Sequence, residues 1–169
     1  MGVLELIQQK AFLGKEFLTW LWFRSETSGA LDLRGGRTAE VEMMGPIVLD
    51  AQYGDARMTT LKGESPATSP EARAALLEGK KLKRAKLKFN RDDNEWVAVL
   101  DGENFNLSGL TMPEAGRMPF DDLIAVRMEW VMEFENILAD LFEVFMTLRM
   151  DAGDWSGELV RIHDWVKSK

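Results

Sequence analysis

The chain has 169 residues, 46% of them hydrophobic and 29% charged, and its 28 acidic residues outnumber 21 basic ones to give a formal net charge of -7. This composition predicts one globular domain, 1–169, with a core of its own. The absence of cysteine excludes disulfides and thiol catalysis, and the single histidine excludes a histidine-rich metal site. Without a signal peptide or a run of roughly 20 apolar residues, we expect a cytoplasmic protein with no membrane partner.

The N-terminal segment, 1–28, predicts a helix whose second half is apolar around nearly its whole circumference. Such a helix has to be covered on most sides. Because one sheet covers only part of this apolar surface, we expect self-association or a partner chain. The side chains expected at that interface are Phe17, Trp20, Trp22 and Phe23.

A sheet with one inserted helix is predicted over residues 37–111. Apolar and charged residues alternate in "TAEVEMMGPIVLD", which predicts a half-buried strand with a bend or bulge at Gly45-Pro46, and "ARMTTLKG" at 56–63 predicts its partner. Ser69, Pro70 and Gly79 occupy the N-cap, first-turn and C-cap positions of a short helix, 69–78. Three later strands, joined by turns at 92–94 and 101–102, predict an antiparallel meander.

Two helices are predicted over residues 119–167. Apolar residues recur at three- and four-residue steps from Pro119 to Met150, over roughly 45 Å, and Gly153 is expected to end this helix. The final helix, beginning near Asp154, carries an apolar side and His163. The fold class is therefore α+β: a mostly antiparallel sheet with a C-terminal meander, flanked by an N-terminal helix, a short middle helix and a long C-terminal helix.

Three methionines of the long helix, Met128, Met132 and Met146, admit two interpretations. Flexible methionine side chains can line an adaptable groove for a partner. They also fill cores, and we favour core filling because the apolar pattern around them is wide enough to be buried.

No catalytic site, metal site or cofactor site is predicted. The acidic pairs Asp92-Asp93 and Asp121-Asp122 fall in a turn and in the first turn of a helix, where carboxylates favour the helix dipole. Asp164 is adjacent to His163 in sequence and points elsewhere on a helix, so the two do not form a catalytic dyad. A metal-dependent nuclease that uses the acidic pairs is the weakest of three hypotheses, and we expect a protein that is not an enzyme.

The segment "EGKKLKRAKLKF", 78–89, is strongly basic within an acidic protein. On a strand, Arg84, Lys86 and Lys88 share one face at a spacing of about 6.6 Å, close to that of successive phosphates in a nucleic acid. A solvated face would more often mix charges of both signs. We therefore predict weak, sequence-independent contact with DNA phosphates. The residues expected to contact DNA are Lys80, Lys81, Lys83, Arg84, Lys86 and Lys88.

The run "SPEARAALLEGKKLKRAKLKFNRDDNEWVAVLDGENFNLSGLTMP", preceded by "FLTWLWFRSE" and "RTAEVEMMGPIVLDA", resembles the C-terminal half of the recombination-associated protein RdgC family. The resemblance implies a non-enzymatic nucleoid protein that forms dimeric rings, takes duplex DNA without sequence specificity and restrains the RecA recombinase. It places the family's Gly-Lys and basic strand on Gly79, Lys80 and Lys81 and the cations that follow. The N-terminal half of the family has no counterpart here and could belong to a separate chain.

Two functions follow as alternatives. The first is a non-catalytic, sequence-independent DNA-binding protein of the recombination-associated type, working as a homo-oligomer or with a partner chain. The second is a structural or assembly subunit, for instance of phage origin, whose basic strand meets an acidic protein surface.

Overall fold

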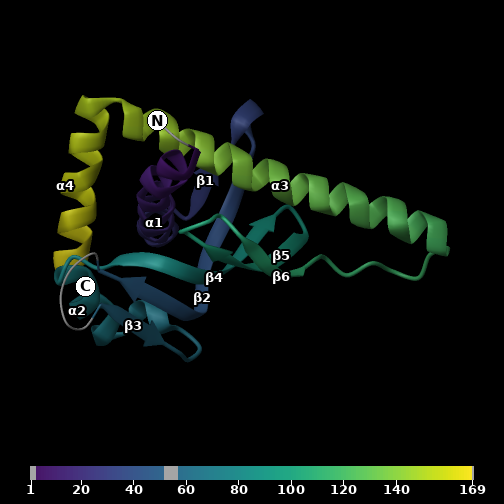
Figure 1. The fold of residues 1–169 in the computed structure, drawn as a ribbon. Coiled ribbons are helices and arrows are strands. Elements are labelled where there is room, and N and C mark those ends of the chain that lie inside the picture. The colour runs from purple at the N-terminus through teal and green to yellow at the C-terminus, as the bar shows by residue number, and fades with distance from the viewer. Residues whose placement is uncertain (1–2, 52–56, 169) are drawn as a thin grey trace.

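The computed structural model describes residues 3–51 and 57–168 and has the α+β architecture expected from the sequence (Figure 1). Residues 1–2 of the predicted N-terminal helix and Ala56 of the predicted second strand lie outside this range. The helices are α1 (Val3–Thr27), α2 (Pro70–Leu77), α3 (Phe120–Met150) and α4 (Ala152–Ser168). The strands are β1 (Ala30–Asp32), β2 (Thr38–Asp50), β3 (Met58–Leu61), β4 (Lys81–Arg91), β5 (Asn94–Asp101) and β6 (Leu107–Thr111).

All strand pairs are antiparallel, in the order β1-β2-β4-β5-β6, with β3 also paired to β2. β4, β5 and β6 form the predicted meander. β1 and β3 pair with opposite ends of β2, on the edge that faces away from β4. β4 is thus a central strand with a neighbour on both sides.

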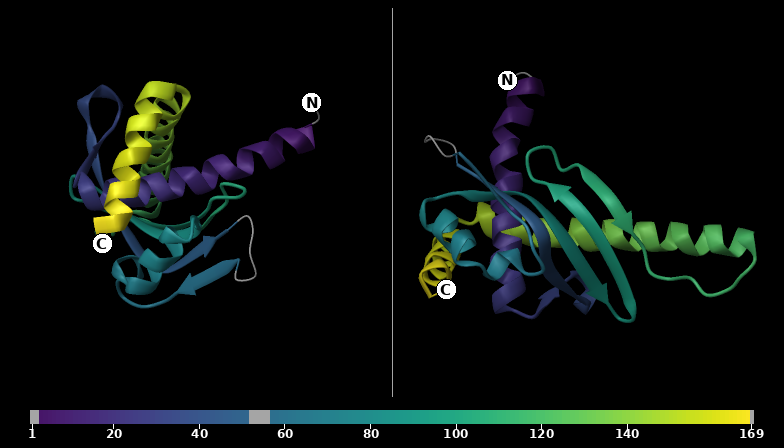
Figure 2. Two further views of the ribbon diagram at one scale, coloured as in Figure 1. Left: turned by 90° about the vertical axis from the view of Figure 1, so that its left-hand side faces the viewer. Right: turned by 90° about the horizontal axis from the view of Figure 1, so that it is seen from below.

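One face of the sheet carries the core. The inward side chains of β4, Ala85, Leu87 and Phe89, are buried together with those of β2 and β5. α1 and α3 lie over this face in Figure 1, and α4 descends beside α1. Seen from below, β4 and β5 lie in front of α1 and α3, and no helix crosses them (Figure 2). The opposite face of these strands is therefore open.

Gly45-Pro46 interrupts the β2–β4 ladder, as the sequence predicted, because the register shifts between Met44 and Ile47. A second shift, between Val48 and Leu49, was not expected and places Lys83 as the extra residue of β4. The hydroxyl of Thr19 accepts the N–H of Leu82 at 2.9 Å, and the carbonyl of Lys83 accepts the N–H of Gly102 at 2.7 Å. These two bonds satisfy backbone groups around the bulge.

The apolar second half of α1 is covered within one chain. Phe17, Trp20, Trp22 and Phe23 are 0 to 4% exposed, and α3, α4 and the sheet contact the helix. The prediction that these four side chains form an interface with another chain is therefore corrected: they belong to the core. Their helix needs cover on every side, as expected, but α3 and α4 supply it.

The middle and C-terminal helices begin and end for identifiable reasons. Ser69 caps α2 by accepting the N–H of Ala72 at 3.1 Å, as predicted. α3 ends at Met150, but Gly153 does not end it, since Gly153 already lies in the first turn of α4. Asp151 separates the helices, and its Oδ1 accepts the N–H groups of Gly153 and Asp154 at 3.0 and 2.9 Å.

The first half of α3 extends beyond the sheet (Figure 1). No residue of α3 before Phe134 is buried. Met128 and Met132 are 62% and 60% exposed, so the core-filling interpretation is wrong for these two methionines, whereas Met146 packs partly against the core. We call residues 120–132 the α3 arm.

No helix in the described part of the chain combines the length and the apolar character that crossing a bilayer requires.

Candidate nucleic-acid interface

The basic strand lies at the centre of the open face. Arg84, Lys86 and Lys88 of β4 alternate with the buried residues Ala85, Leu87 and Phe89, which is the two-residue period predicted from the sequence. In the ladder, Arg84 faces Val48 and Asp101, and Lys86 faces Met44 and Val99. The three cations therefore form one row on the face of the sheet that α1 and α3 leave open.

Carboxylates from neighbouring segments neutralise Lys88 of this row and Lys83 at the bulge beside it. Lys88 Nζ lies 2.7 Å from Glu42 Oε2 on β2 and 4.0 Å from Glu95 Oε2 on β5. Lys83 Nζ lies 3.1 Å from Glu103 Oε2 in the turn after β5. The open face thus mixes charges of both signs, which the basic segment taken alone did not indicate.

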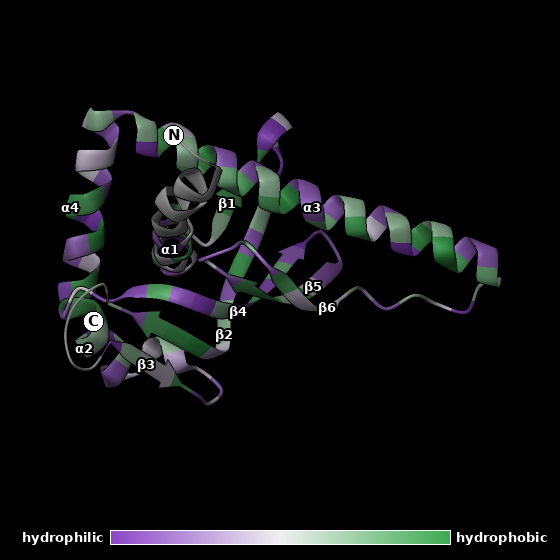
Figure 3. Cartoon of the chain, in the orientation of Figure 1, coloured by the Kyte–Doolittle hydropathy of each residue, from purple (hydrophilic) through white to green (hydrophobic). Residues whose placement is uncertain are grey.

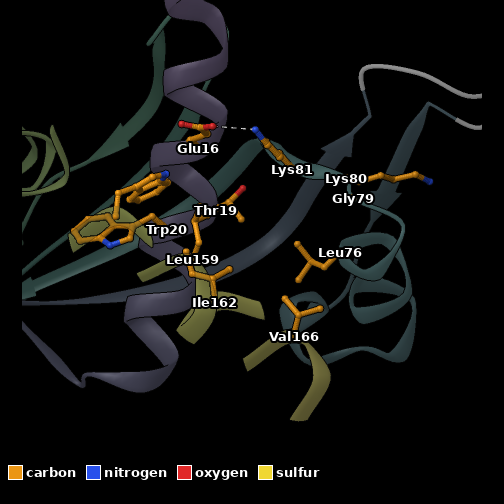
Figure 4. Close-up of a pocket in the computed structure, with 11 residues that line it drawn as sticks. Glu16, Thr19, Trp20, Leu76, Gly79, Lys80, Lys81, Leu159, Ile162 and Val166 are labelled. Carbon is orange, nitrogen blue, oxygen red and sulfur yellow. Dashed lines mark hydrogen bonds and ion pairs between the residues drawn. The ribbon is translucent and has the colours of Figure 1, made fainter. Parts of the chain in front are cut away.

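Lys80 and Lys81 do not extend the row along the strand. Lys80 is buried, and its Nζ donates to Thr59 Oγ1 at 2.9 Å and lies 3.3 Å from Glu78 Oε2. Lys81 Nζ lies 3.1 Å from Glu16 Oε1 of α1. Figure 4 shows Lys81 directed toward Glu16 while the side chain of Lys80 extends away from both. These two lysines connect elements of the fold.

Two cations of the row have no carboxylate partner in the part of the chain that the structure describes. Among the described residues, Arg84 and Lys86 make no side-chain hydrogen bond or ion pair that would occupy their charge. Arg84 is exposed and Lys86 half-buried. The half-buried Met44, Val97 and Val99 surround Lys86 on the adjacent strands. The centre of the open face is therefore a small cationic patch on an apolar background.

The ion pairs of the basic strand shift the pKa values of two groups, Lys88 and Glu103. The hydrogen bond that Lys88 donates to the Glu42 carboxylate raises the pKa of Lys88 above its ordinary value. Burial acts to raise the pKa of Glu103, but the hydrogen bonds and charges of Lys83 and Lys15 outweigh it and hold this pKa below its ordinary value. Both shifts favour the charged forms, so the pairs persist at neutral pH.

The residues considered for metal-dependent catalysis lie where the sequence placed them. Asp92 and Asp93 are exposed in the turn between β4 and β5, and Asp121 and Asp122 are exposed in the first turn of α3. In the described residues no three acidic or histidine side chains are grouped closely enough to hold a metal ion. His163 is exposed on α4, 3.9 Å from Asp164.

The carboxylates that pair with the basic row were not identified from the sequence. One signal for them existed, because Glu40 and Glu42 alternate with Ala39, Val41 and Met43 and must share the open face of β2. Which cation each carboxylate meets depends on the β2–β4 register and on the Lys83 bulge.

Comparison with known protein families and with curated protein sequences finds no family model and no sequence that matches the chain. The resemblance to the RdgC family therefore stays a prediction from the motifs themselves.

Proposed function

We propose that this protein is a non-catalytic, sequence-independent DNA-binding protein of the recombination-associated type, acting at the nucleoid as an oligomer or with a partner chain. The observation that carries the proposal is the open face of β4, where Arg84 and Lys86 stand two residues apart and pair with no carboxylate of residues 3–51 or 57–168. Cations spaced at about 6.6 Å match the spacing of consecutive phosphates. Contacts to phosphates carry no information on base sequence, so such binding is independent of sequence. The motif resemblance to the RdgC family supports the same function.

Binding is weak in this proposal, for two reasons. The net charge of -7 opposes the approach of a polyanion. Lys83 and Lys88 must also break their ion pairs with Glu103 and Glu42 before they can contact phosphates and contribute to binding. Two free cations give a slope of log affinity against log salt of about -1.5, at roughly 0.7 to 0.9 per phosphate contact.

The test is a salt titration of labelled short duplexes of unrelated sequence, and of single strands. The double substitution Arg84→Gln, Lys86→Gln should bring the slope of log affinity against log salt close to zero and weaken binding to all DNA sequences alike. Glu42→Gln with Glu103→Gln should release Lys88 and Lys83, strengthen binding and steepen the slope by about 1.5. Arg127→Gln with Lys167→Gln, on the helices, removes the same charge as the first pair and should leave the slope unchanged.

A slope that is the same in wild type and in the Arg84→Gln, Lys86→Gln variant would show that the row is not the DNA site. Equal weakening by the Arg127→Gln, Lys167→Gln control would attribute binding to net charge alone.

The second candidate is the assembly subunit, in which the same face contacts an acidic protein surface. The observation that favours it is the mixed character of the face, with Met44, Val97 and Val99 around Lys86 and carboxylates at its borders. Protein interfaces combine an apolar centre with a polar rim in this way. If the Arg84→Gln, Lys86→Gln variant loses assembly while no DNA binding is measurable, this candidate replaces the first.

A further inference from the structure

An apolar stripe runs along the side of α3 that the core leaves uncovered. Phe120, Ile124, Met128 and Met132 follow one another at four-residue steps, and they are 74%, 43%, 62% and 60% exposed. Residues at this spacing lie on one face of a helix. Figure 3 shows apolar positions recurring along the exposed half of α3. Such a stripe on an extended helix is the kind of surface that partners bury.

The stripe leads into a pocket of about 440 Å³ at the point where α3 meets α1 and the β5–β6 turn. Three- and four-residue steps continue from Met132 through Glu135 and Leu138 to Phe142 and Met146, so the pocket and the arm share one face. The pocket is lined by Leu13, Phe17, Phe105, Glu135, Leu138, Ala139, Phe142 and Met146. The stripe and the pocket together span about 40 Å from Phe120 to Met146, at 1.5 Å per residue, and we call this apolar surface the groove of α3.

The charges beside the groove are mostly negative. Between Asp121 and Glu135, α3 carries five acidic residues and one basic residue, Arg127. Glu133 pairs with Arg91 at 2.8 Å. Asp121, Glu129 and Glu135 are exposed and have no ion pair within the described part of the chain. Glu135 also lines the apolar pocket itself.

We infer that the groove of α3 is a docking site for a basic amphipathic helix of a partner protein. Its apolar side chains fill the stripe and the pocket, and its lysines or arginines meet Asp121, Glu129 and Glu135. Charge complementarity selects this occupant, because a second copy of α3 would bring the same carboxylates against each other. Methionines suit the site, since flexible thioether side chains adapt to the partner's surface. The pocket is lined by residues of α1, α3 and the β5–β6 turn and by no residue of β4, so this site is separate from the proposed DNA site.

The experiment uses the full chain and two synthetic helical peptides with the same leucine face, one flanked by lysine and the other by glutamate. Fluorescence anisotropy should show that the lysine peptide binds at least about tenfold more tightly than the glutamate peptide. The double substitution Met128→Gln, Met132→Gln should lower the affinity for the lysine peptide by about tenfold or more. The double substitution Glu129→Gln, Glu135→Gln should lower the affinity for the lysine peptide by roughly threefold to tenfold and should not lower the affinity for the glutamate peptide.

Controls separate this site from general attraction to an acidic protein. A scrambled lysine peptide of the same composition, which has no apolar face, should bind poorly. Met150→Gln, at an exposed position beyond the groove, should leave affinity unchanged. Equal affinity for both helical peptides, or unchanged binding by the Met128→Gln, Met132→Gln variant, would overturn the inference. The inference would also be overturned if the protein were a dimer at neutral pH and the Met128→Gln, Met132→Gln variant a monomer, because a second copy would then occupy the groove.

Discussion

Glu103 is the carboxylate that links the basic strand to α1. Its carboxylate oxygens lie 3.1 Å from Lys83 Nζ and 3.4 Å from Lys15 Nζ. Lys15 Nζ also lies 2.8 Å from Asp50 Oδ2. The lowered pKa of Glu103 means that its pairs stabilise the fold above the ordinary glutamate pKa and are lost as the pH falls through the lowered value. Because Glu103 is partly exposed, the energy involved is small.

Replacing Lys83 by Gln should raise the pKa of Glu103, since one of its two cations is removed. The measurement is an NMR titration of the Glu103 carboxyl carbon in both proteins. Lys62→Gln removes the same charge from an exposed loop position and should leave the titration unchanged. An identical pKa in the wild type and in Lys83→Gln would contradict the ion pair.

At the scale of elements, α1 and the β5–β6 turn cross at two glycines. A Cβ atom on Gly14 would overlap the carbonyl group of Gly102, and one on Gly102 would come within 3.0 Å of the Gly14 backbone. This contact brings the helix close enough for Lys15 to reach Glu103 and Asp50. No side chain can move aside to relieve such a clash, because both partners are backbone.

Gly14→Ala should therefore destabilise the protein by about 1–3 kcal/mol, although alanine is the better helix former. Gly157→Ala in α4 is the matched control, because a Cβ there meets no atom within 4 Å. That variant should be more stable by about 0.5–1 kcal/mol. Urea denaturation measures both effects, and stabilisation by Gly14→Ala would show that the crossing is looser than described.

The periodicity of the longer helices and strands was predictable from the sequence, whereas the contacts between them were not. Alternation in 38–50 and 81–91 predicted two half-buried strands, and the cap residues around 70–77 predicted α2 within a residue. β1 was missed because "SGALDLRGGR" shows turn residues on both sides of a three-residue strand. The burial of Trp20 and Trp22 was anticipated, but one sequence does not reveal that α3 and α4 of the same chain provide it.

For the candidate site, too, the face on which the cations lie was predictable, whereas their ion-pair partners were not. Arg84, Lys86 and Lys88 share an open face because strand periodicity requires it. The neutralisation of Lys83 and Lys88 depends on residues distant in sequence, so the basic segment alone overstated its positive charge. Lys80 is buried because the chain turns at Gly79, which has a φ of +83°, before it enters β4.

At the scale of the molecule, exposed apolar surface and net charge oppose each other. The net charge of -7 opposes the approach of a second copy at neutral pH, while the α3 arm presents Phe120, Met128 and Met132 to solvent. The sequence pI is about 4.9, so this repulsion disappears as the pH approaches 5.

Sedimentation should therefore show self-association increasing from pH 7.5 toward pH 5. Met128→Gln with Met132→Gln should reduce it, and Leu77→Gln, at an exposed position on α2, should not. Association near pH 5 that the methionine changes leave untouched would place the associating surface elsewhere.

α3 is one unbroken helix that is anchored from Trp130 onward, where the Trp130 carbonyl accepts the indole N–H of Trp96 at 3.1 Å. Its first turns project beyond this anchor, so the helix behaves as a cantilever. Phe134, Ile137, Leu141 and Phe145 hold the fixed end in the core, and Phe120 is about 20 Å beyond the first of them. Bending displaces the tip of a cantilever most and its root least. A spin label at position 120 should therefore report wide motion in the free protein. Labels nearer Phe134 should report progressively less.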